Sequence, residues 1–120
     1  MGLDERMFLD DGWTVPSQSQ GLPARRLVGR SGGLIVPLHR AWRYALGARL
    51  RSDGEGLTRV QAFANGRRVG AWDATGEWAD YELEVPESAL RPGRNLIRLR
   101  TPADPTPGLA VAAVWMEPLR

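Results

Sequence analysis

The sequence contains no cysteine and only one histidine, His39. Without cysteine the chain has no disulfide bond, no thiolate metal site and no cysteine nucleophile. With a single histidine it also lacks the raw material for catalytic triads and for ordinary zinc sites. His39 lies between Leu38 and Arg40 at a predicted strand end, where a lone histidine is more often a surface or packing residue than a catalyst. The sequence therefore predicts a protein that is not an enzyme.

Lysine is absent as well, so all 16 basic residues are arginine. The chain has 14 acidic residues and a net charge of only +2, which is too small to indicate a nucleic-acid-binding protein. No apolar run is long enough to span a membrane. The first residues are acidic and do not form a signal peptide, because a positively charged start and an apolar core are missing. An extracellular and a virion-associated location both stay open.

The length and composition predict one globular domain that covers residues 1–120. A chain of 120 residues is near the commonest domain size. With 42% hydrophobic and 25% charged residues, it has the composition of a protein that buries a core. No internal repeat divides the chain, and no segment shows a sustained helical period. We expect little helix beyond a single turn at residues 88–91.

The clearest strand patterns lie in residues 78–100. Residues 81–85 alternate between apolar and acidic side chains, which places the two kinds on opposite faces of a half-buried strand. Pro86 ends this strand because proline cannot donate a hydrogen bond to a neighbouring strand. A Pro-Gly pair at residues 92–93 predicts a turn, and residues 95–101 resume the alternation. This segment predicts a sheet protein.

Asn65-Gly66 favours a type I′ turn, because both central residues of that turn need positive φ. We therefore expect a hairpin of residues 60–64 and 67–72. Residues 17–23 have the composition of a polar loop. Further strands are expected at residues 7–9, 13–15, 25–30, 33–38, 44–51 and 109–116, with a turn or bulge at 31–33. About eight short strands at this spacing predict an all-β antiparallel sandwich or barrel.

Five tryptophans are more than a domain of this size usually carries. Indole rings stack on the apolar faces of sugars and also anchor cores and interfaces. Trp115 lies in the apolar last strand and is expected in the core. Trp72 ends one strand and Trp78 opens the next, so they form either a platform at one rim or a plug at the end of the core. Trp42 lies in the cation-rich segment 39–43, which is either a ligand patch or a structured loop.

Two acidic pairs are candidates for chemistry. Glu82 and Glu84 lie on one strand face at about 7 Å, near the spacing in inverting glycosidases. Neighbours on one face cannot flank a sugar from both sides, so we interpret this pair as a solvated acidic face. Asp10 and Asp11, beside Gly12, offer two ligands for a structural calcium ion, which needs about six to eight oxygens. We therefore assign no metal site, and a structural calcium stays open.

A series of residues, taken in the order in which they occur, extends over almost the whole chain and has a recognisable pattern. The series consists of Gly12-Trp13, residues 34–38, Tyr44, residues 65–70, Trp78-x-x-Tyr81-x-Leu83-x-Val85-Pro86 and Leu90-x-Pro92-Gly93-x-Asn95-x-Ile97-x-Leu99. In this order the residues resemble the galactose-binding-like, or carbohydrate-binding-module-like, jelly-roll β-sandwiches. The resemblance implies a jelly-roll sandwich that is non-catalytic. Such domains are often appended to bacterial glycosyltransferases and glycoside hydrolases, and others mediate adhesion or assembly.

We therefore expect a non-catalytic binding module with carbohydrate as the favoured ligand. The predicted ligand site consists of Trp72, Trp78 and Trp42 as stacking surfaces, with Arg43 and Asp73 as polar partners that fix orientation. The alternative is a structural subunit of a larger assembly, for example a virion decoration protein. The tryptophans and arginines would then anchor protein interfaces, and a closed homo-oligomer would be expected.

Overall fold

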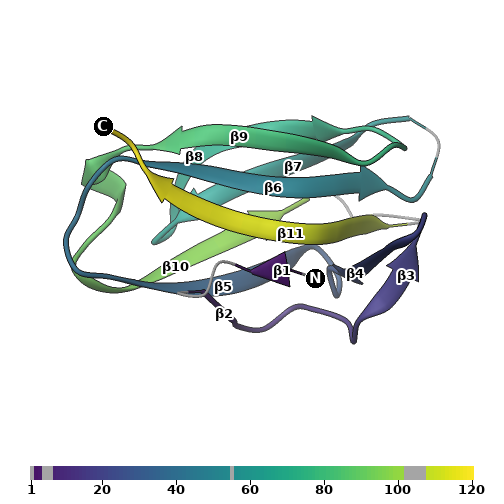
Figure 1. The fold of residues 1–120 in the computed structure, drawn as a ribbon, viewed down its shortest axis with the longest axis horizontal. Helices are drawn as coiled ribbons and strands as arrows, with labels where there is room; N and C mark the ends of the chain where they lie inside the picture. The colour runs from purple at the N-terminus through teal and green to yellow at the C-terminus, as the bar shows by residue number, and fades with distance from the viewer. Residues whose placement is uncertain (1, 4–6, 55, 102–107) are drawn as a thin grey trace.

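The computed structural model describes residues 2–3, 7–54, 56–101 and 108–120, which form two sheets packed face to face (Figure 1). One sheet has the strand order β3-β4-β11-β6-β9, with β1 beside β11, and the other has the order β2-β5-β10-β7-β8. The strands are β1 (Gly2–Leu3), β2 (Phe8–Leu9), β3 (Ser17–Ser19), β4 (Leu22–Arg26), β5 (Ser31–Leu38), β6 (Tyr44–Ser52), β7 (Thr58–Ala64), β8 (Arg67–Ala74), β9 (Ala79–Val85), β10 (Gly93–Arg100) and β11 (Leu109–Pro118). The predicted all-β antiparallel sandwich is confirmed. Only the short β1 pairs in parallel within the described ranges.

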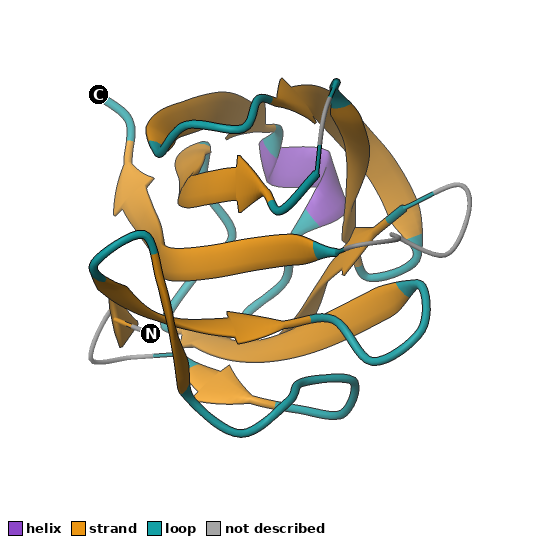
Figure 2. Ribbon diagram, turned by 90° about the vertical axis from the view of Figure 1, so that its right-hand side faces the viewer, coloured by secondary structure: helices purple, strands orange, loops and turns teal. Residues whose placement is uncertain are grey.

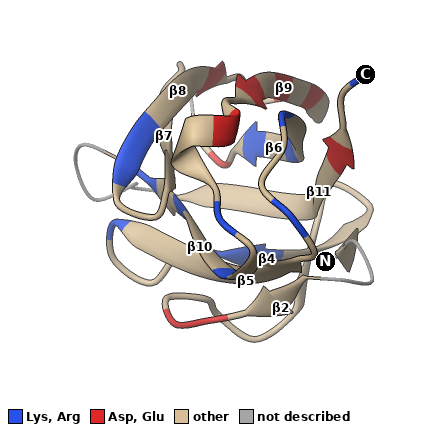
Figure 3. Cartoon of the chain, turned by 90° about the vertical axis from the view of Figure 1, so that its left-hand side faces the viewer, with Lys and Arg blue, Asp and Glu red and all other residues tan. Residues whose placement is uncertain are grey.

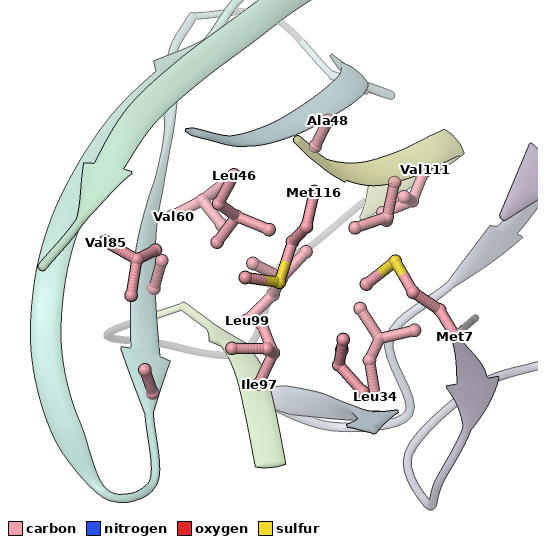
Figure 4. Packing of buried hydrophobic residues seen from close by; sticks show 14 of the residues in the cluster. Met7, Leu34, Leu46, Ala48, Val60, Val85, Ile97, Leu99, Val111 and Met116 are labelled. Atoms are coloured by element: carbon pink, nitrogen blue, oxygen red, sulfur yellow. The ribbon is translucent and has the colours of Figure 1, made fainter. Parts of the chain in front are cut away.

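The core lies between the two sheets and is built from the inward positions of each strand. Leu46 and Met116 from one sheet meet Val60, Ile97 and Leu99 from the other (Figure 4), and all five are essentially inaccessible to solvent. The alternation along each strand sends every second side chain into this layer. Burial of these apolar side chains is the main favourable contribution to folding.

Strand β9 shows the predicted alternation. Val85 is buried, and Tyr81 and Leu83 pack partly buried against the core. The acidic residues between them are exposed, as the sequence predicted. Pro86 follows the strand and precedes a single 3₁₀ turn, Glu87–Ala89, which is the helical turn in Figure 2. The sequence placed this turn at residues 88–91. The chain then crosses to the other sheet, so β9 and β10 do not pair with each other.

The Asn65-Gly66 hairpin is also confirmed. Asn65 has φ 50° and Gly66 has φ 84°, and Ala64 pairs with Arg67 directly across the turn. The Asn65 side chain donates to the carbonyl oxygen of Ala89 at 3.0 Å, which ties the hairpin to the 3₁₀ turn. The local turn preference and the tertiary contacts therefore favour the same conformation.

The polar segment 17–23 was predicted as a loop, and that prediction was wrong. It contains the hairpin of β3 and β4, which turns at Gln20 (φ 48°) and Gly21 (φ 84°). Ser17 and Gln18 are exposed on an edge strand, so they carry no apolar alternation that would mark a strand. The sequence pattern misses such strands because backbone pairing, and not burial, holds them.

The turn or bulge expected at residues 31–33 is instead the beginning of β5. Gly32 lies beneath the indole of Trp13, where a β-carbon would come within 2.8 Å of two ring atoms. The Trp13 indole N–H also donates to the carbonyl oxygen of Gly33 at 2.8 Å. Trp13 itself makes only an isolated bridge to Leu27, so the strand expected at 13–15 is reduced to one residue. Glycine is therefore required here for close packing.

The sequence predicted that Trp115 lies in the core, and that prediction was wrong. Its neighbours Val114 and Met116 are 1% exposed and fill the core, so alternation directs Trp115 to the outer side of the sheet. There it is partly buried. An apolar strand does not show which of its faces is covered, and this is the reason for the error.

In the described part of the chain, no helix has the length and hydropathy needed to cross a membrane.

Candidate functional site

Trp72 is a core residue in this structure. Its side chain is 7% exposed, belongs to the main hydrophobic cluster and lies 6.3 Å from the ring of Tyr81 at an interplanar angle of 43°. Its indole N–H is buried without a hydrogen-bond acceptor. Trp72 therefore has no open face on which a sugar could stack. The sequence left two alternatives for Trp72, a binding platform at one rim of the sandwich or a plug at the end of the core. Its burial matches the plug.

Trp42 and Trp78 lie at opposite ends of the sandwich. Trp42 precedes the first residue of β6, whereas Trp78 precedes β9, whose first residue Ala79 pairs with Leu50 near the end of β6. At about 3.3 Å per residue, these two ends are roughly 25 Å apart. Figure 1 shows β6 and β9 running side by side in opposite directions, which places their starts at opposite ends. The three predicted tryptophans therefore do not form one platform.

The hollow around Trp42 has a volume of about 530 Å³ and a cationic lining. The Arg40 guanidinium carbon lies 4.8 Å from the centre of the Trp42 ring, and the Trp42 indole N–H donates to the carbonyl oxygen of Leu119. Arg43 donates to the carbonyl oxygen of Arg120 at 2.8 Å and lies 3.4 Å from a carboxylate oxygen of Glu84. One face of the Trp42 ring is therefore covered by a cation, as expected for a structured loop.

Asp73 lies on the outer side of β8, because it alternates with the buried Trp72. Its carboxylate is 3.4 Å from the guanidinium of Arg59 on the neighbouring strand. Both side chains are about half exposed, so this is a surface ion pair that contributes little to stability. The structure does not bring Asp73 together with Trp42 or Arg43.

A second hollow surrounds Trp78 at the end of the sandwich where β6 ends and β9 begins, which is the end that Figure 2 faces. It has a volume of about 370 Å³ and is lined by Gln20, Arg51, Gly76, Glu77 and Trp78. An indole ring, an amide, a guanidinium and a carboxylate thus share one small surface. This combination offers an apolar stacking face together with planar hydrogen-bonding groups.

Two turns position the side chains of this hollow. In the β3–β4 turn, Gln20 has a left-handed backbone (φ 48°) and lines the hollow from the tip of the hairpin. In the turn before β9, the Thr75 hydroxyl lies 3.3 Å from both the N–H and the carbonyl oxygen of Glu77. The Trp78 indole N–H donates to the carbonyl oxygen of Ser19 at 3.0 Å. This last bond fixes the edge of the indole and joins the two turns.

Arg51 is held in place by three hydrogen bonds. Its Nε donates to the carbonyl oxygen of Gly76 at 2.9 Å, and one terminal nitrogen donates to the Ser19 hydroxyl and to Asp53 Oδ1, both at 2.9 Å. The same carboxylate accepts from Arg26 Nε at 2.5 Å and from its Nη2 at 3.1 Å. Asp53 therefore joins two arginines and fixes the orientation of the guanidinium that lines the hollow.

The pKa of Asp53 lies below the ordinary value of 3.8. Burial is the largest single influence and raises this pKa, but the hydrogen bond and charge of Arg26, with contributions from Ser19 and Arg51, together lower it more. Because the folded pKa is below the unfolded pKa, the ionised carboxylate stabilises the fold above the unfolded value. This stabilisation is lost as the pH falls through the lowered folded pKa.

Asp53→Asn is expected to lower the free energy of unfolding by about 2 kcal/mol at pH 7, because two arginines lose a charged acceptor. Urea unfolding of both proteins from pH 7 to pH 2 measures the difference. It should stay constant above about pH 5 and shrink as the carboxylate of the parent protein becomes protonated. A difference that persists unchanged at pH 2 would show that the charge of Asp53 is not responsible.

Sequence reasoning missed most of this hollow. Of its lining residues it proposed only Trp78, and it treated the segment that contains Gln20 as a polar loop. Arg51 and Ser19 are 32 residues apart in the chain and meet only because β3 and β6 finish at the same end of the sandwich, although β4 and β11 lie between them in the sheet. No local pattern marks such a network, because its members belong to different strands.

The architecture is that of the galactose-binding-like jelly-roll sandwiches, and several solved carbohydrate-binding modules share it. A family 35 carbohydrate-binding module from an environmental isolate is 19% identical, with a TM-score of 0.66 over 95% of this chain and 92% of that chain. A family 36 module in complex with calcium and xylotriose is 18% identical, with a TM-score of 0.61 over 94% of this chain and 93% of that chain. The resemblance drawn from the sequence is confirmed at the level of fold.

The GH26-CBM35 β-(1,4)-mannanase of Podospora anserina also matches, with 15% identity and a TM-score of 0.73. The match covers 97% of this chain but only 26% of the mannanase, so the likeness concerns one part of that enzyme. No protein-family model and no curated protein matches the sequence. At these identities, the comparisons establish the fold.

The calcium in the family 36 structure raises the question of whether Asp10 and Asp11 bind this ion here. The Arg98 guanidinium lies 3.0 Å from Asp11 Oδ1 and 3.9 Å from Asp10 Oδ2. Within the described ranges, no three His, Cys, Asp or Glu side chains are grouped as a metal site would require. Because Arg98 occupies the Asp11 carboxylate and no third acidic side chain joins the pair among the described residues, Asp10 and Asp11 do not fit a calcium ion.

Proposed function

We propose that this chain is a non-catalytic carbohydrate-binding module and that the hollow around Trp78 is its sugar site. The observation that carries the proposal is the fixed indole of Trp78 beside the immobilised guanidinium of Arg51. A pyranose ring can stack on the indole, while Arg51 donates to its hydroxyl groups. Gln20 can donate and accept, and the Glu77 carboxylate can accept. These groups can bind and orient a sugar, and the described residues of the lining offer only one carboxylate, whereas glycoside hydrolysis ordinarily uses a pair.

The size of the hollow limits the ligand. Its volume of about 370 Å³ is near the lower end of the range of about 300–1,000 Å³ for small-molecule sites. We therefore assign it one end of a glycan chain, with the remaining sugar residues in solvent. A module with this fold has been solved with xylotriose, and another belongs to a β-(1,4)-mannanase. A xylanase chain that joins a family 22 module to its GH10 module has been solved with xylohexaose. Neutral β-linked oligosaccharides of these kinds are the first ligands to test.

Trp78→Ala is expected to weaken binding of xylohexaose or mannohexaose at least about tenfold, or about 1.4 kcal/mol, because the stacking face is lost. Glu77→Ala should weaken binding less, since it removes one exposed acceptor. Isothermal titration calorimetry measures both effects, and circular dichroism checks the fold of each variant. Trp42→Ala is the matched control, since it removes the same side chain at the opposite end and should leave binding unchanged.

Two results would overturn the proposal. One is that xylo-, manno- and gluco-hexaoses all fail to bind at millimolar concentration. The other is that the Trp78→Ala variant binds as tightly as the parent protein. Sedimentation gives the mass of the protein in the same samples, for comparison with the chain mass of 13.2 kDa. A large closed oligomer without any glycan response would instead support the structural subunit considered from the sequence.

A further inference from the structure

The outer face of the sheet that contains β6 carries one tryptophan, Trp115, in an unusual setting. In the register of the sheet, Trp115 on β11 pairs with Gly47 on β6, and Gly47 pairs with Glu82 on β9. A β-carbon at position 47 would lie 2.1 Å from the indole atoms Cε2 and Nε1. The ring therefore occupies the space directly above the Gly47 backbone. Its inner face lies against the sheet, and it extends across β6 toward β9.

The indole N–H of Trp115 also differs from those of the other tryptophans. Trp13, Trp42 and Trp78 each donate to a backbone carbonyl oxygen, and the N–H of Trp72 is buried. Among the described residues, Trp115 is the one tryptophan whose N–H is neither buried nor hydrogen-bonded within the chain. It is thus available to a ligand group that lies beyond the edge of the ring, since an indole N–H points in the ring plane.

The neighbours of the ring are small on one side and acidic at the rim. Along β6 the outward neighbours of Gly47 are Ala45 and Arg49. Ala45 is small, and Arg49 is paired with Asp80 on β9 at 2.7 Å, so a large side chain lies on only one side of the Trp115 row on that strand. Glu82 lies across Gly47, and Glu117 on β11 pairs with Ala45. In Figure 3 the acidic positions lie along β9 and near the end of β11. Neither Glu82 nor Glu117 forms an ion pair within the described part of the chain, so both carboxylates can accept hydrogen bonds.

We propose that this surface, the Trp115 platform (Gly47, Glu82, Trp115 and Glu117), is a second binding surface that takes a neutral, extended polysaccharide chain. The apolar face of a sugar ring stacks on the open face of the indole, its hydroxyl groups donate to the flanking carboxylates, and the indole N–H donates to a sugar oxygen. The two uncompensated carboxylates repel an anionic chain, so polyuronates are excluded. The platform lies on a sheet face and not at a loop end, so a chain can pass across it in both directions.

This proposal goes beyond the Trp78 hollow and does not depend on it. With two separate surfaces, one domain could contact a single polymer chain at two places or bind two polymer chains at once. The second contact would then raise the apparent affinity for long chains without changing the affinity for short ones. The two surfaces therefore predict different dependences on the length of the glycan.

Affinity gel electrophoresis with soluble xylan, galactomannan and hydroxyethylcellulose tests the platform. Trp115→Ala is expected to weaken retardation by at least one of these neutral polymers about tenfold or more, while xylotriose binding measured by calorimetry stays unchanged. Glu82→Ala, at an exposed position without an ion pair, should weaken the same retardation about threefold. Polygalacturonate should not retard the parent protein. Phe8→Ala is the matched control, since it removes an exposed aromatic side chain from the outer face of the other sheet.

The result that overturns the platform is retardation unchanged in both Trp115→Ala and Glu82→Ala. The Glu82 variant keeps the test decisive if the Trp115 variant does not fold. If Trp78→Ala alone removes all binding, the platform fails and the Trp78 hollow stands. If Trp115→Ala removes polymer binding while Trp78→Ala has no effect on any glycan, the platform stands and the proposed sugar site at Trp78 fails.

Discussion

Trp72→Ala is expected to lower the free energy of unfolding by about 3–5 kcal/mol, the range for removing a large aromatic side chain from a core. The side chain is 7% exposed and packs at an angle against Tyr81, so its removal leaves a cavity between β8 and β9. Neighbouring strands cannot collapse into such a cavity without breaking their pairing with β7 and β6. Urea unfolding followed by far-UV circular dichroism measures the change.

Trp72→Phe is the matched control for this prediction. It keeps most of the aromatic volume and removes the buried N–H that has no acceptor. The loss of volume and the removal of an unsatisfied donor act in opposite directions, so we expect a change below about 2 kcal/mol. Glycan binding of this variant should equal that of the parent protein. An alanine variant that loses less than about 1 kcal/mol would show that Trp72 is not part of the core.

Asn95→Ala is expected to cost about 3–5 kcal/mol, because one buried amide serves several backbone groups at once. Asn95 is 1% exposed. Its Nδ2 donates to the carbonyl oxygens of Val36, Arg91 and Gly93, and its Oδ1 accepts from the N–H of Arg91 and from the side chain of Asn65. Alanine leaves these groups without a partner at the point where β10 enters the sheet. Urea unfolding at pH 7 measures the loss.

Asn65→Gly provides the comparison for Asn95. Glycine adopts the positive φ of position 65 without strain, so the turn itself is kept. The variant loses the side-chain bonds to Ala89, Asn95 and the N–H of Leu96, but position 65 is exposed and water can replace part of them. We expect a loss of about 1–2 kcal/mol. A larger loss for Asn65→Gly than for Asn95→Ala would contradict the central role given to the buried amide.

The two arginine networks differ in what they can do for the site. Arg51 and Arg26 share the half-buried Asp53 and hold the Trp78 hollow, so their loss affects both stability and the sugar site. Arg49 and Asp80 form an exposed pair with two hydrogen bonds of 2.7 and 3.2 Å, in which the hydrogen bond from Arg49 is the main cause of a lowered pKa for Asp80. This pair flanks the row of Trp115 without covering it.

The sequence predicted the local elements of this fold well. Alternation fixed the inward and outward faces of β9, and Asn65-Gly66 fixed a type of turn whose backbone few other pairs can adopt. The edge hairpin of β3 and β4 escaped prediction because its residues are polar on an exposed edge. The glycines of β5 suggested a break, whereas Gly32 permits the close approach of Trp13.

The candidate site was predicted less completely. Of its proposed residues, Trp78 alone lines the hollow that we assign to sugar, while Trp72 is in the core. Trp42 lies at the other end of the sandwich with its ring under Arg40. The number of tryptophans drew attention to binding, but the role of each depends on which face of its strand is covered. That information lies in the partner sheet and not in the neighbouring residues.

The sequence by itself determined that this protein is a two-faced sheet protein, because alternation and turn chemistry act between residues close in the chain. Only the tertiary structure decided which strands pair, and hence that β11 lies between β4 and β6 and that β9 and β10 belong to different sheets. Those pairings place Arg51 beside Ser19 and Trp115 above Gly47. Both surfaces that we propose for glycans are formed by segments that lie far apart in the chain. Burial of the whole core selects the strand pairings that bring these segments together, and no local preference does so.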